Sequence, residues 1–259
     1  SKLQNKKLVF DSHELFSEIP ELVHKKRVKN VWVFLEQTII PKLQTVITVS
    51  DSIKKHYQDL YGISAIVIRN IPVIKTINPK EFEIETNGKK IILYQGSVNI
   101  GRGIELMIET MPLLEEYIFV IIGDGDITEK LKNKVTNLSL VDRVKFLGKK
   151  TPNELKKLTP NATIGISLEE DLGLNYRYAL PNKIFDYLHA NVPVIVADLK
   201  EMKTLINNYS FGKVLQERST ECLAKTIKSM EYISYKKELK DAKEELNWSI
   251  EKEKLTSIF

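Results

Sequence analysis

The stretch NATIGISLEEDLGLNYRYALPNKIFDYLHANVPVIVAD, residues 161–198, decides the fold. Its two apolar runs, residues 162–168 and 192–197, are short and continuous, which is typical of parallel strands buried on both faces. A polar loop between them leads to a helix that we expect to open near Pro181, since proline suits the first helical turn. Apolar residues at helical spacing mark its buried face: Leu180, Ile184, Tyr187 and Leu188. Loops at the carboxyl ends of parallel strands, beside helix N-termini, are where ligands and above all anions bind.

The alternation of strands and helices continues on both sides of this stretch. Further strands are predicted over residues 90–95, 117–122, 143–147 and 213–216. Helices are predicted over residues 104–114, 127–137, 152–158, 203–208, 220–232 and 236–259. Alternation with short connections implies right-handed crossovers and a doubly wound parallel sheet.

The N-terminal part has the same character but fewer elements. Strands are predicted over residues 8–10, 45–49 and 65–68, and helices within residues 23–41 and over residues 52–61. Ser50 is a suitable cap for the second of these helices. Residues 78–88 are rich in charge and end in Asn-Gly, so we expect a linker between two units.

Composition limits the possible functions without selecting one. The 259 residues, 42% of them hydrophobic, suffice for one large or two small domains. The single Cys222 excludes an internal disulfide and a cysteine-based zinc site, and fits a reducing cytoplasm. The net charge of +5 can attract phosphates or an anionic membrane but is too diffuse to indicate nucleic acid. No apolar run approaches the roughly 20 residues that span a bilayer, and we expect no signal peptide.

The segment YQGSVNIGRGIELMIE, residues 94–109, combines a strand end, a glycine-rich loop and a helix start. Gly96, Gly101 and Gly103 allow close approach of the backbone to a ligand, and the helix N-terminus favours an anion. Arg102 adds a guanidinium suited to phosphate oxygens, although a surface arginine that caps the loop is the alternative. The spacing is not the dinucleotide-binding fingerprint.

These motifs resemble the retaining GT-B glycosyltransferases of family 4, the group 1 transferases. The run PNKIFDY, residues 181–187, is similar to a variant of their signature, and the Pro-Val-Ile run at 193–195 fixes its register. The resemblance implies that Asp186 binds the ribose of a nucleotide-sugar. Tyr178 falls where the family usually has a glutamate that contacts the donor sugar. The alternative for Asp186 is a solvated helix residue.

The same resemblance extends to further donor-binding residues. Arg102 takes the place usually held by a lysine, whereas Ser97 takes a place often held by arginine. Lys183 would bring an ammonium to the phosphates, and its alternative is a solvated helix lysine. The remaining expected donor contacts are Gly123, Gly148 and Lys149, the last two through backbone groups at the nucleobase, together with Leu180 and Asn182.

His13, in the segment DSHE, is the candidate from the N-terminal part. The resemblance places it in the cleft near the reacting carbon, and the alternative is a histidine that caps the junction of strand and loop. The expected catalytic residues are thus His13, Arg102 and Lys183. The acidic run at 169–171 would suit acid/base or metal chemistry, but we favour loop solvation or sugar-hydroxyl binding.

The expected organisation follows the resemblance. It is a GT-B-like α/β fold with a complete C-terminal Rossmann-like sheet over residues 89–238 and a partial N-terminal, acceptor-side Rossmann-like domain over residues 1–72. Residues 73–88 form the linker, and residues 239–259 form a helix that crosses back to the first domain. We expect the first several strands of the N-terminal domain to be missing from this chain.

The expected activity is sugar transfer, with retention, from a nucleotide-diphosphate-sugar to the hydroxyl of a glycan or lipid-linked acceptor. No cofactor and no metal are expected. The basic and apolar segment at 24–43 suits contact with an anionic membrane or simply a helix packed on its own sheet, so the expected location is cytoplasmic, with peripheral membrane contact open. The alternatives are a nucleotide-sugar epimerase and a non-catalytic nucleotide-binding or partner module.

Overall fold

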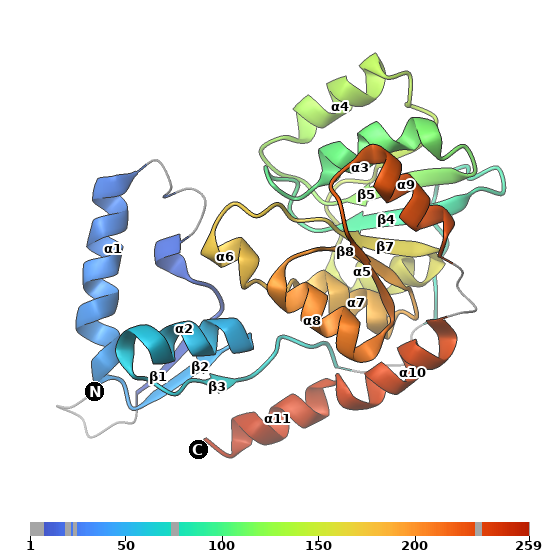
Figure 1. Ribbon diagram of the computed structural model, residues 1–259. Helices are drawn as coiled ribbons and strands as arrows, with labels where there is room; N and C mark the ends of the chain where they lie inside the picture. Colours follow the sequence, from blue (N-terminus) through green and yellow to red (C-terminus); the bar gives the residue numbers. More distant parts are fainter. Residues whose placement is uncertain (1–7, 19–21, 23–24, 74–77, 231–234, 259) are drawn as a thin grey trace.

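The computed structural model describes residues 8–18, 22, 25–73, 78–230 and 235–258, and it contains two parallel sheets (Figure 1). The larger sheet has the order β6-β5-β4-β7-β8-β9. Its strands are β4 (Lys90–Gln95), β5 (Tyr117–Ile122), β6 (Val144–Phe146), β7 (Ile164–Ser167), β8 (Val194–Ala197) and β9 (Gly212–Leu215). All five ladders are parallel, and every residue of β5, β7 and β8 is buried. This confirms the doubly wound sheet predicted from the apolar runs.

Helices cover both faces of this sheet. Helices α3 (Ile104–Thr110), α4 (Thr128–Asn137) and α9 (Thr220–Lys228) pack together on one face. Helices α5 (Pro152–Leu158), α7 (Asn182–His189), α8 (Lys200–Tyr209) and α10 (Lys236–Glu245) belong to the other layer, where α10 packs on α7 and α8. Short 3₁₀ turns extend two of these helices, η5 (Met111–Leu113) after α3 and η6 (Thr159–Asn161) after α5. The side change follows from right-handed crossovers, because the chain reverses direction across the sheet after β6.

The smaller sheet has the order β1-β2-β3, with β1 (Val9–Ser12), β2 (Thr45–Thr48) and β3 (Ile66–Val67). Helix α2 (Asp51–Tyr61) packs on it through Ile53 and Tyr57. The Ser50 hydroxyl accepts a hydrogen bond from the Ile53 amide, as the sequence predicts for an N-cap. Helix α1 (Lys26–Ile39) and the 3₁₀ turns η2 (Phe16–Glu18) and η4 (Ile40–Lys42) complete the unit.

The predicted single helix over residues 236–259 is wrong, because two helices, α10 and α11 (Trp248–Thr256), occupy this segment within the described residues. The break comes at Asn247, whose side-chain oxygen accepts hydrogen bonds from the amides of Ser249 and Ile250. Asparagine favours an N-cap over a helix interior, because its short side chain competes for backbone groups. Helix α11 crosses to the smaller sheet, where Leu255 packs with Ile47.

Three further contacts join the two units. The Leu15 amide donates to the side-chain oxygen of Asn175, in the short helix α6 (Leu174–Arg177) that sequence patterning missed. The Ser52 amide donates to Glu201 on α8, at 2.8 Å. The Arg69 amide donates to the buried Glu251 of α11, at 3.0 Å. Over the described residues, no helix is long and apolar enough to cross a membrane.

Candidate functional site at the switch point of the larger sheet

The larger sheet has a topological switch point between β4 and β7. From β4 the chain winds outward to β5 and β6, and from β7 it winds the other way to β8 and β9. The crevice at the carboxyl ends of the two central strands is the usual ligand site of such a sheet. The loop after β4 carries the glycine segment, and the loop after β7 carries the acidic run. The topology therefore brings together the two segments that the sequence had marked separately.

The glycines of the loop after β4 have different roles. A Cβ on Gly103 would lie 2.1 Å from the Leu168 carbonyl oxygen, and one on Gly101 would lie 2.5 Å from Leu172 Cδ1. Because both residues lack a Cβ, the two central loops can pack against each other, and both also have a positive φ that favours glycine. Gly96 differs, because the nearest atoms to its Cβ position are the ends of Lys183 and Tyr94, at 3.6 Å. The exposed Gly96 backbone therefore faces the Lys183 ammonium.

The loops after β5 and β6 adjoin this point. The Gly123 amide donates to the Gly148 carbonyl at 3.0 Å, and a Cβ on Gly123 would lie 1.8 Å from the Gly96 carbonyl oxygen. Gly123 is therefore required for loop packing, whereas Gly148 is exposed and has open space around its Cβ position. Lys149 is exposed and lies 3.9 Å from the Asp124 carboxylate.

A buried ionic cluster lies beside Gly96. The Lys183 ammonium donates to Glu169 Oε1 at 2.8 Å and stands 4.3 Å from the centre of the Tyr94 ring. The Arg102 guanidinium lies 4.0 Å from the same carboxylate oxygen and 5.1 Å from the Tyr176 ring centre. Glu169 has a fully buried side chain, Lys183 is 10% exposed and Arg102 is 30% exposed. The structure thus brings together two of the three expected catalytic residues, Arg102 and Lys183.

The ionic pair sets the charge state of the cluster. Burial opposes the charged form of Glu169, yet the neighbouring Lys183 ammonium and the Ser167 hydroxyl hold the pKa of this carboxyl below its usual range. Burial likewise opposes a charged Lys183, and Glu169 nonetheless raises the pKa of the ammonium. Both groups are therefore charged at neutral pH. Arg102 leaves the cluster with one net positive charge, which suits an anionic ligand.

Asp186 lies one turn further along α7, in a second polar network. The Gln95 amide nitrogen donates to Asp186 Oδ2 at 3.1 Å, and the Thr159 hydroxyl donates to the Gln95 side-chain oxygen at 2.9 Å. Burial raises the pKa of the Asp186 carboxyl. Asp186 is thus half-buried and hydrogen-bonded, and the ribose contact expected of it stays a prediction.

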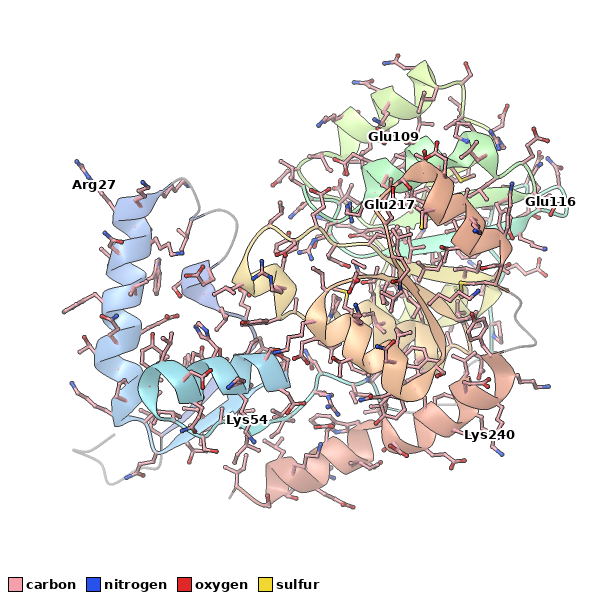
Figure 2. All side chains as sticks on the ribbon, viewed as in Figure 1. Arg27, Lys54, Glu109, Glu116, Glu217 and Lys240 are labelled. Carbon is pink, nitrogen blue, oxygen red and sulfur yellow. The ribbon has the colours of Figure 1, made fainter. Side chains whose placement is uncertain are left out.

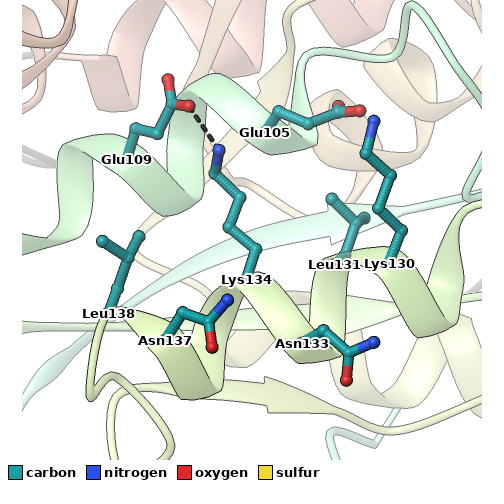
Figure 3. Close-up of a pocket in the computed structure, with 8 residues that line it drawn as sticks. All are labelled: Glu105, Glu109, Lys130, Leu131, Asn133, Lys134, Asn137 and Leu138. Carbon is teal, nitrogen blue, oxygen red and sulfur yellow. Dashed lines mark hydrogen bonds and ion pairs between the residues drawn. The ribbon is translucent and has the colours of Figure 1, made fainter.

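A cleft of about 710 Å³ opens beside Asp186. Its walls include the linker, α5, α7 and α10, and its lining residues include Pro72, Pro152, Leu155, Lys156, His189 and Lys243. The mixture of apolar walls and a few polar groups is typical of small-molecule sites. The open groove between α3 and α4 has a similar volume, about 720 Å³, but its charged residues form surface ion pairs such as Glu109 with Lys134 (Figure 3).

Tyr178 is not among the residues that line the cleft beside Asp186. Its carbonyl accepts a hydrogen bond from Ser50, and its ring lies 6.3 Å from His56 and 5.6 Å from the Lys200 ammonium. The side chain packs on the core of the first unit. Tyr178 is the residue that follows helix α6, and it lies at the contact between the units. The donor-sugar contact expected at Tyr178 stays a prediction.

Other expected residues are distributed around the switch point. Ser97 is exposed, and its carbonyl accepts from the Tyr94 hydroxyl at 2.6 Å. Asn182 is exposed at the first position of α7, next to Pro181, which precedes the helix as its N-cap rather than opening it. Leu180 is buried in the main core, which restricts any ligand contact to its backbone.

His13 lies on the smaller sheet's side of the molecule. It is 56% exposed, and its Nε2 lies 3.0 Å from Asp11 Oδ2. The next residues of the loop approach the larger unit, since Glu14 and Leu15 both contact Asn175. The role expected for His13 stays a prediction.

Sequence reasoning missed the partners that hold the site. Glu169 was interpreted as a solvated or sugar-binding carboxylate, but it is a buried ion-pair partner. Its two acidic neighbours each have a cation as well, Arg218 for Glu170 and Arg177 for Asp171. Gln95 is the one signal available in the sequence, as a polar residue at the carboxyl end of an apolar strand. Across the described residues, no group of histidine, cysteine, aspartate and glutamate could hold a metal ion.

The fold defines an α/β protein of the GT-B class, in which a partial and a complete Rossmann-like unit are joined. The family model described as glycosyl transferases group 1 matches residues 76–246, and the chain belongs to this family. An uncharacterized glycosyltransferase of Methanocaldococcus jannaschii is 26% identical over 199 residues, 69% of this chain and 48% of that protein. The aligned region thus spans about half the length of this relative.

Solved structures show the same fold. Sucrose-phosphate synthase from Thermosynechococcus elongatus has a TM-score of 0.79 at 16% identity, covering 99% of this chain and 69% of that one. Anabaena HepE, solved in complex with UDP and glucose, has a TM-score of 0.78 at 15% identity, covering 100% and 72%. S. aureus TarM, solved in complex with UDP, fondaparinux and alpha-GlcNAc-glycerol, has a TM-score of 0.73 at 15% identity, covering 99% and 52%.

Proposed function

We propose that this chain is the donor-binding part of a glycosyltransferase that moves a sugar from a nucleoside-diphosphate-sugar to an acceptor hydroxyl with retention of configuration. The observation that carries the proposal is the pair of cations, Arg102 and Lys183, at the switch point of the larger sheet. Lys183 is one helical turn from Asp186 on α7. This arrangement matches the parts of the donor, because the cations suit a diphosphate and the carboxylate suits a ribose diol.

The chemistry would proceed at the sugar's anomeric carbon. The bond from this carbon to the diphosphate oxygen breaks, and the diphosphate leaves with the electron pair. The acceptor oxygen forms the new bond and releases its proton to a diphosphate oxygen or to solvent. Negative charge develops on the leaving group, so Arg102, Lys183 and the exposed Gly96 backbone would accelerate the step by stabilising that charge.

The remaining parts of the donor have matching surroundings. The cleft beside Asp186 has room for a nucleoside, with Pro152 and Leu155 as apolar walls. Gly148 and Lys149 precede this wall, so backbone contact with the base at that loop is part of the proposal. We propose that the reaction needs no metal, which is supported by the cation that each carboxylate of the 169–171 run already has.

The relatives support a sugar nucleotide and a carbohydrate as reactants. HepE was solved with UDP and glucose, and TarM was solved with UDP and alpha-GlcNAc-glycerol. By the same analogy we propose a glycan or lipid-linked glycan as the acceptor, held mainly by the first unit, with His13 at the cleft. Polysaccharide assembly at the cytoplasmic side of a membrane is the corresponding setting.

A non-catalytic nucleotide-binding module is the second candidate. The observation in its favour is Ser97, which replaces an expected cation of the glycine loop. Against it, the Lys183 ammonium stands over the same loop, 3.9 Å from the Cβ position of Gly96, and supplies a second positive charge. An epimerase would require acid and base groups on both faces of the sugar, and His13 and Glu14 are the cleft candidates.

The test is calorimetric titration of the chain with UDP, GDP, ADP and dTDP and with their sugar conjugates. The variants are Asp186→Asn, which preserves shape, and Glu109→Gln as a matched control in a surface ion pair (Figure 3). Binding of one nucleotide that is weakened in Asp186→Asn and unchanged in Glu109→Gln supports the donor site. Binding without sugar transfer to glycan acceptors favours the non-catalytic module. No binding of any nucleotide refutes the proposal.

A further inference from the structure

We propose that Glu169 is a positioning residue, which holds the Lys183 ammonium at the floor of the diphosphate site. This inference rests on the proposed donor function. Glu169 does not face solvent and is not available to a substrate, since its side chain is fully buried. Its role would be to act through Lys183, to which it is joined at 2.8 Å.

The Glu169 carboxylate is itself fixed in place. The Ser167 hydroxyl donates to Oε2 at 2.7 Å, and this leaves Oε1 for the Lys183 ammonium. The Arg218 guanidinium donates to the Leu168 carbonyl at 2.7 Å and thereby anchors the backbone just before Glu169. A carboxylate held at both ends can determine where a flexible lysine side chain places its charge.

Stability alone does not explain this pair. Burying an ion pair has a large desolvation cost, and apolar residues of similar volume usually serve a fold as well or better. The pair nevertheless stands at the switch point, beside Gly96, where the absence of a Cβ leaves room above the ammonium. The Tyr94 ring closes the other side of Lys183 at 4.3 Å. The ammonium is therefore enclosed by a carboxylate, an aromatic ring and an exposed glycine backbone that a phosphate can approach.

The carboxylate also keeps the two cations compatible. Its Oε1 lies between Lys183, at 2.8 Å, and Arg102, at 4.0 Å, so one negative charge offsets the repulsion of two positive ones. Arg102 Nε is buried and has no hydrogen-bond partner among the described residues. The Arg102 side chain as a whole is 30% exposed and Lys183 is 10% exposed, so a ligand can approach both cations.

Replacement of the carboxylate by an amide has a consequence that a purely structural role would not produce. The groups that face Lys183 are Glu169 from the loop after β7, Tyr94 from β4 and Arg102 from the glycine loop, with Arg218 bonded to the backbone nearby. Without Glu169, burial and Arg102 both lower the pKa of Lys183. The ammonium then loses its proton at a lower pH than in the wild type, so nucleotide affinity falls as the pH rises.

The experiment measures the affinity for UDP, GDP, ADP and dTDP between pH 6 and pH 9. For the nucleotide that binds, we expect Glu169→Gln to reduce affinity about tenfold or more at the alkaline end, with a smaller reduction at pH 6. The double variant Glu169→Gln with Lys183→Arg should lose this pH dependence, because arginine stays protonated. Glu169→Gln with Lys183→Met removes both charges and gives the baseline, and Glu109→Gln is the control for a distant pair.

The outcomes separate this inference from the donor function. If the wild type and Glu169→Gln bind the nucleotide with the same affinity at every pH, the positioning role is overturned and the donor function is not. A uniform loss that Lys183→Arg does not alter also overturns it, because Glu169 would then act by another route. A wild-type chain that binds no nucleotide overturns both proposals. Urea unfolding of each variant shows whether it folds. If Glu169→Gln does not fold, the double variant with Lys183→Met, which leaves no unpaired buried charge, tests the role of the pair instead.

Discussion

Replacement of Gly103 by alanine tests how tightly the two central loops pack. Gly103 has a φ of 76°, and its added Cβ would lie 2.1 Å from the Leu168 carbonyl oxygen. Gly62, at the end of α2, is a matched control, since it has a φ of 67° and nothing within 4 Å of its Cβ position. Both substitutions place an L-residue in the left-handed region, which costs about 1–2 kcal/mol. The comparison between them isolates the clash.

The clash adds a second cost at Gly103 alone. Close carbon–oxygen contacts in proteins are about 3.3 Å long, so the two loops would have to separate by about 1.2 Å. Overpacking of this kind costs about 1–3 kcal/mol, which gives about 2–5 kcal/mol for Gly103→Ala against about 1–2 kcal/mol for Gly62→Ala. Because Arg102 precedes Gly103, the displacement should also weaken nucleotide binding, whereas Gly62→Ala should not change it.

Urea unfolding followed by circular dichroism measures the difference. With an m-value of about 2–3 kcal/mol/M, the extra 1–3 kcal/mol corresponds to a midpoint lower by about 0.3–1.5 M in Gly103→Ala than in Gly62→Ala. The two units can unfold separately, so each transition is fitted on its own. Equal midpoints for the two variants would refute the prediction that tight packing of Gly103 on Leu168 adds a cost of its own. Unchanged nucleotide affinity in Gly103→Ala would refute the prediction that this packing positions Arg102.

Three further predictions follow from other contacts. Burial raises the pKa of Asp186, so its charged form destabilises the fold, and Asp186→Asn should be more stable than the wild type at pH 7. The difference in unfolding free energy between the two proteins should disappear as the pH falls toward 4, and a difference in urea unfolding that stays constant with pH would contradict this. Asn247→Ala should lower the free energy of unfolding by about 1 kcal/mol through loss of the α11 cap, and a change under about 0.3 kcal/mol would argue against it. Helix α1 has no buried residue and exposes Val31 and Phe34, and Arg27 projects from it (Figure 2). The chain should therefore sediment with vesicles that contain anionic lipid, and Phe34→Glu should abolish this binding. Equal binding to neutral vesicles would exclude an electrostatic contribution to membrane binding.

The larger sheet was predictable because its signal is local. The four inner strands coincide with short apolar runs, and the predicted bounds of β4 and β5 match the structure residue for residue. The helices between them have apolar faces at helical spacing, as in α7, where Ile184, Tyr187 and Leu188 are buried. Burial on both faces of a parallel sheet leaves such a pattern in any window of six residues.

Two features that the sequence analysis did not predict, helix α6 and the break at Asn247, have one physical cause, because each is too short to leave a periodic signal. Helix α6 has four residues and follows Gly173, so no helical period could be recognised in it. Tyr178 directly follows this helix and lies at the contact between the units. Asn247 likewise interrupts a continuous helical pattern with a single cap.

The arrangement of the candidate site was only partly predictable, because residue types show chemistry and the fold determines which of them meet. Arg102, Lys183 and Asp186 were found through motifs, but Glu169 is 14 residues from Lys183 and no period links them. Their meeting depends on two facts that local sequence does not contain, the placement of β7 next to β4 and the packing of Gly103 on Leu168. The sequence alone therefore does not predict which buried residue, here Glu169, pairs with a site residue such as Lys183.

The position of Lys183 has one more consequence for how the site works. In the glycine loop Ser97 brings no charge, and the second cation comes instead from the first turn of α7. Lys183 and Asp186 then belong to one short helix, whose inner face is locked by Tyr187, with its hydroxyl bonded to the Leu93 carbonyl and the Gln95 amide. The contacts proposed for phosphate and for ribose are therefore positioned by one helix, while Arg102 is positioned by the other loop. Any separation of the two central loops would part the two cations and weaken diphosphate binding before it disturbed the ribose contact.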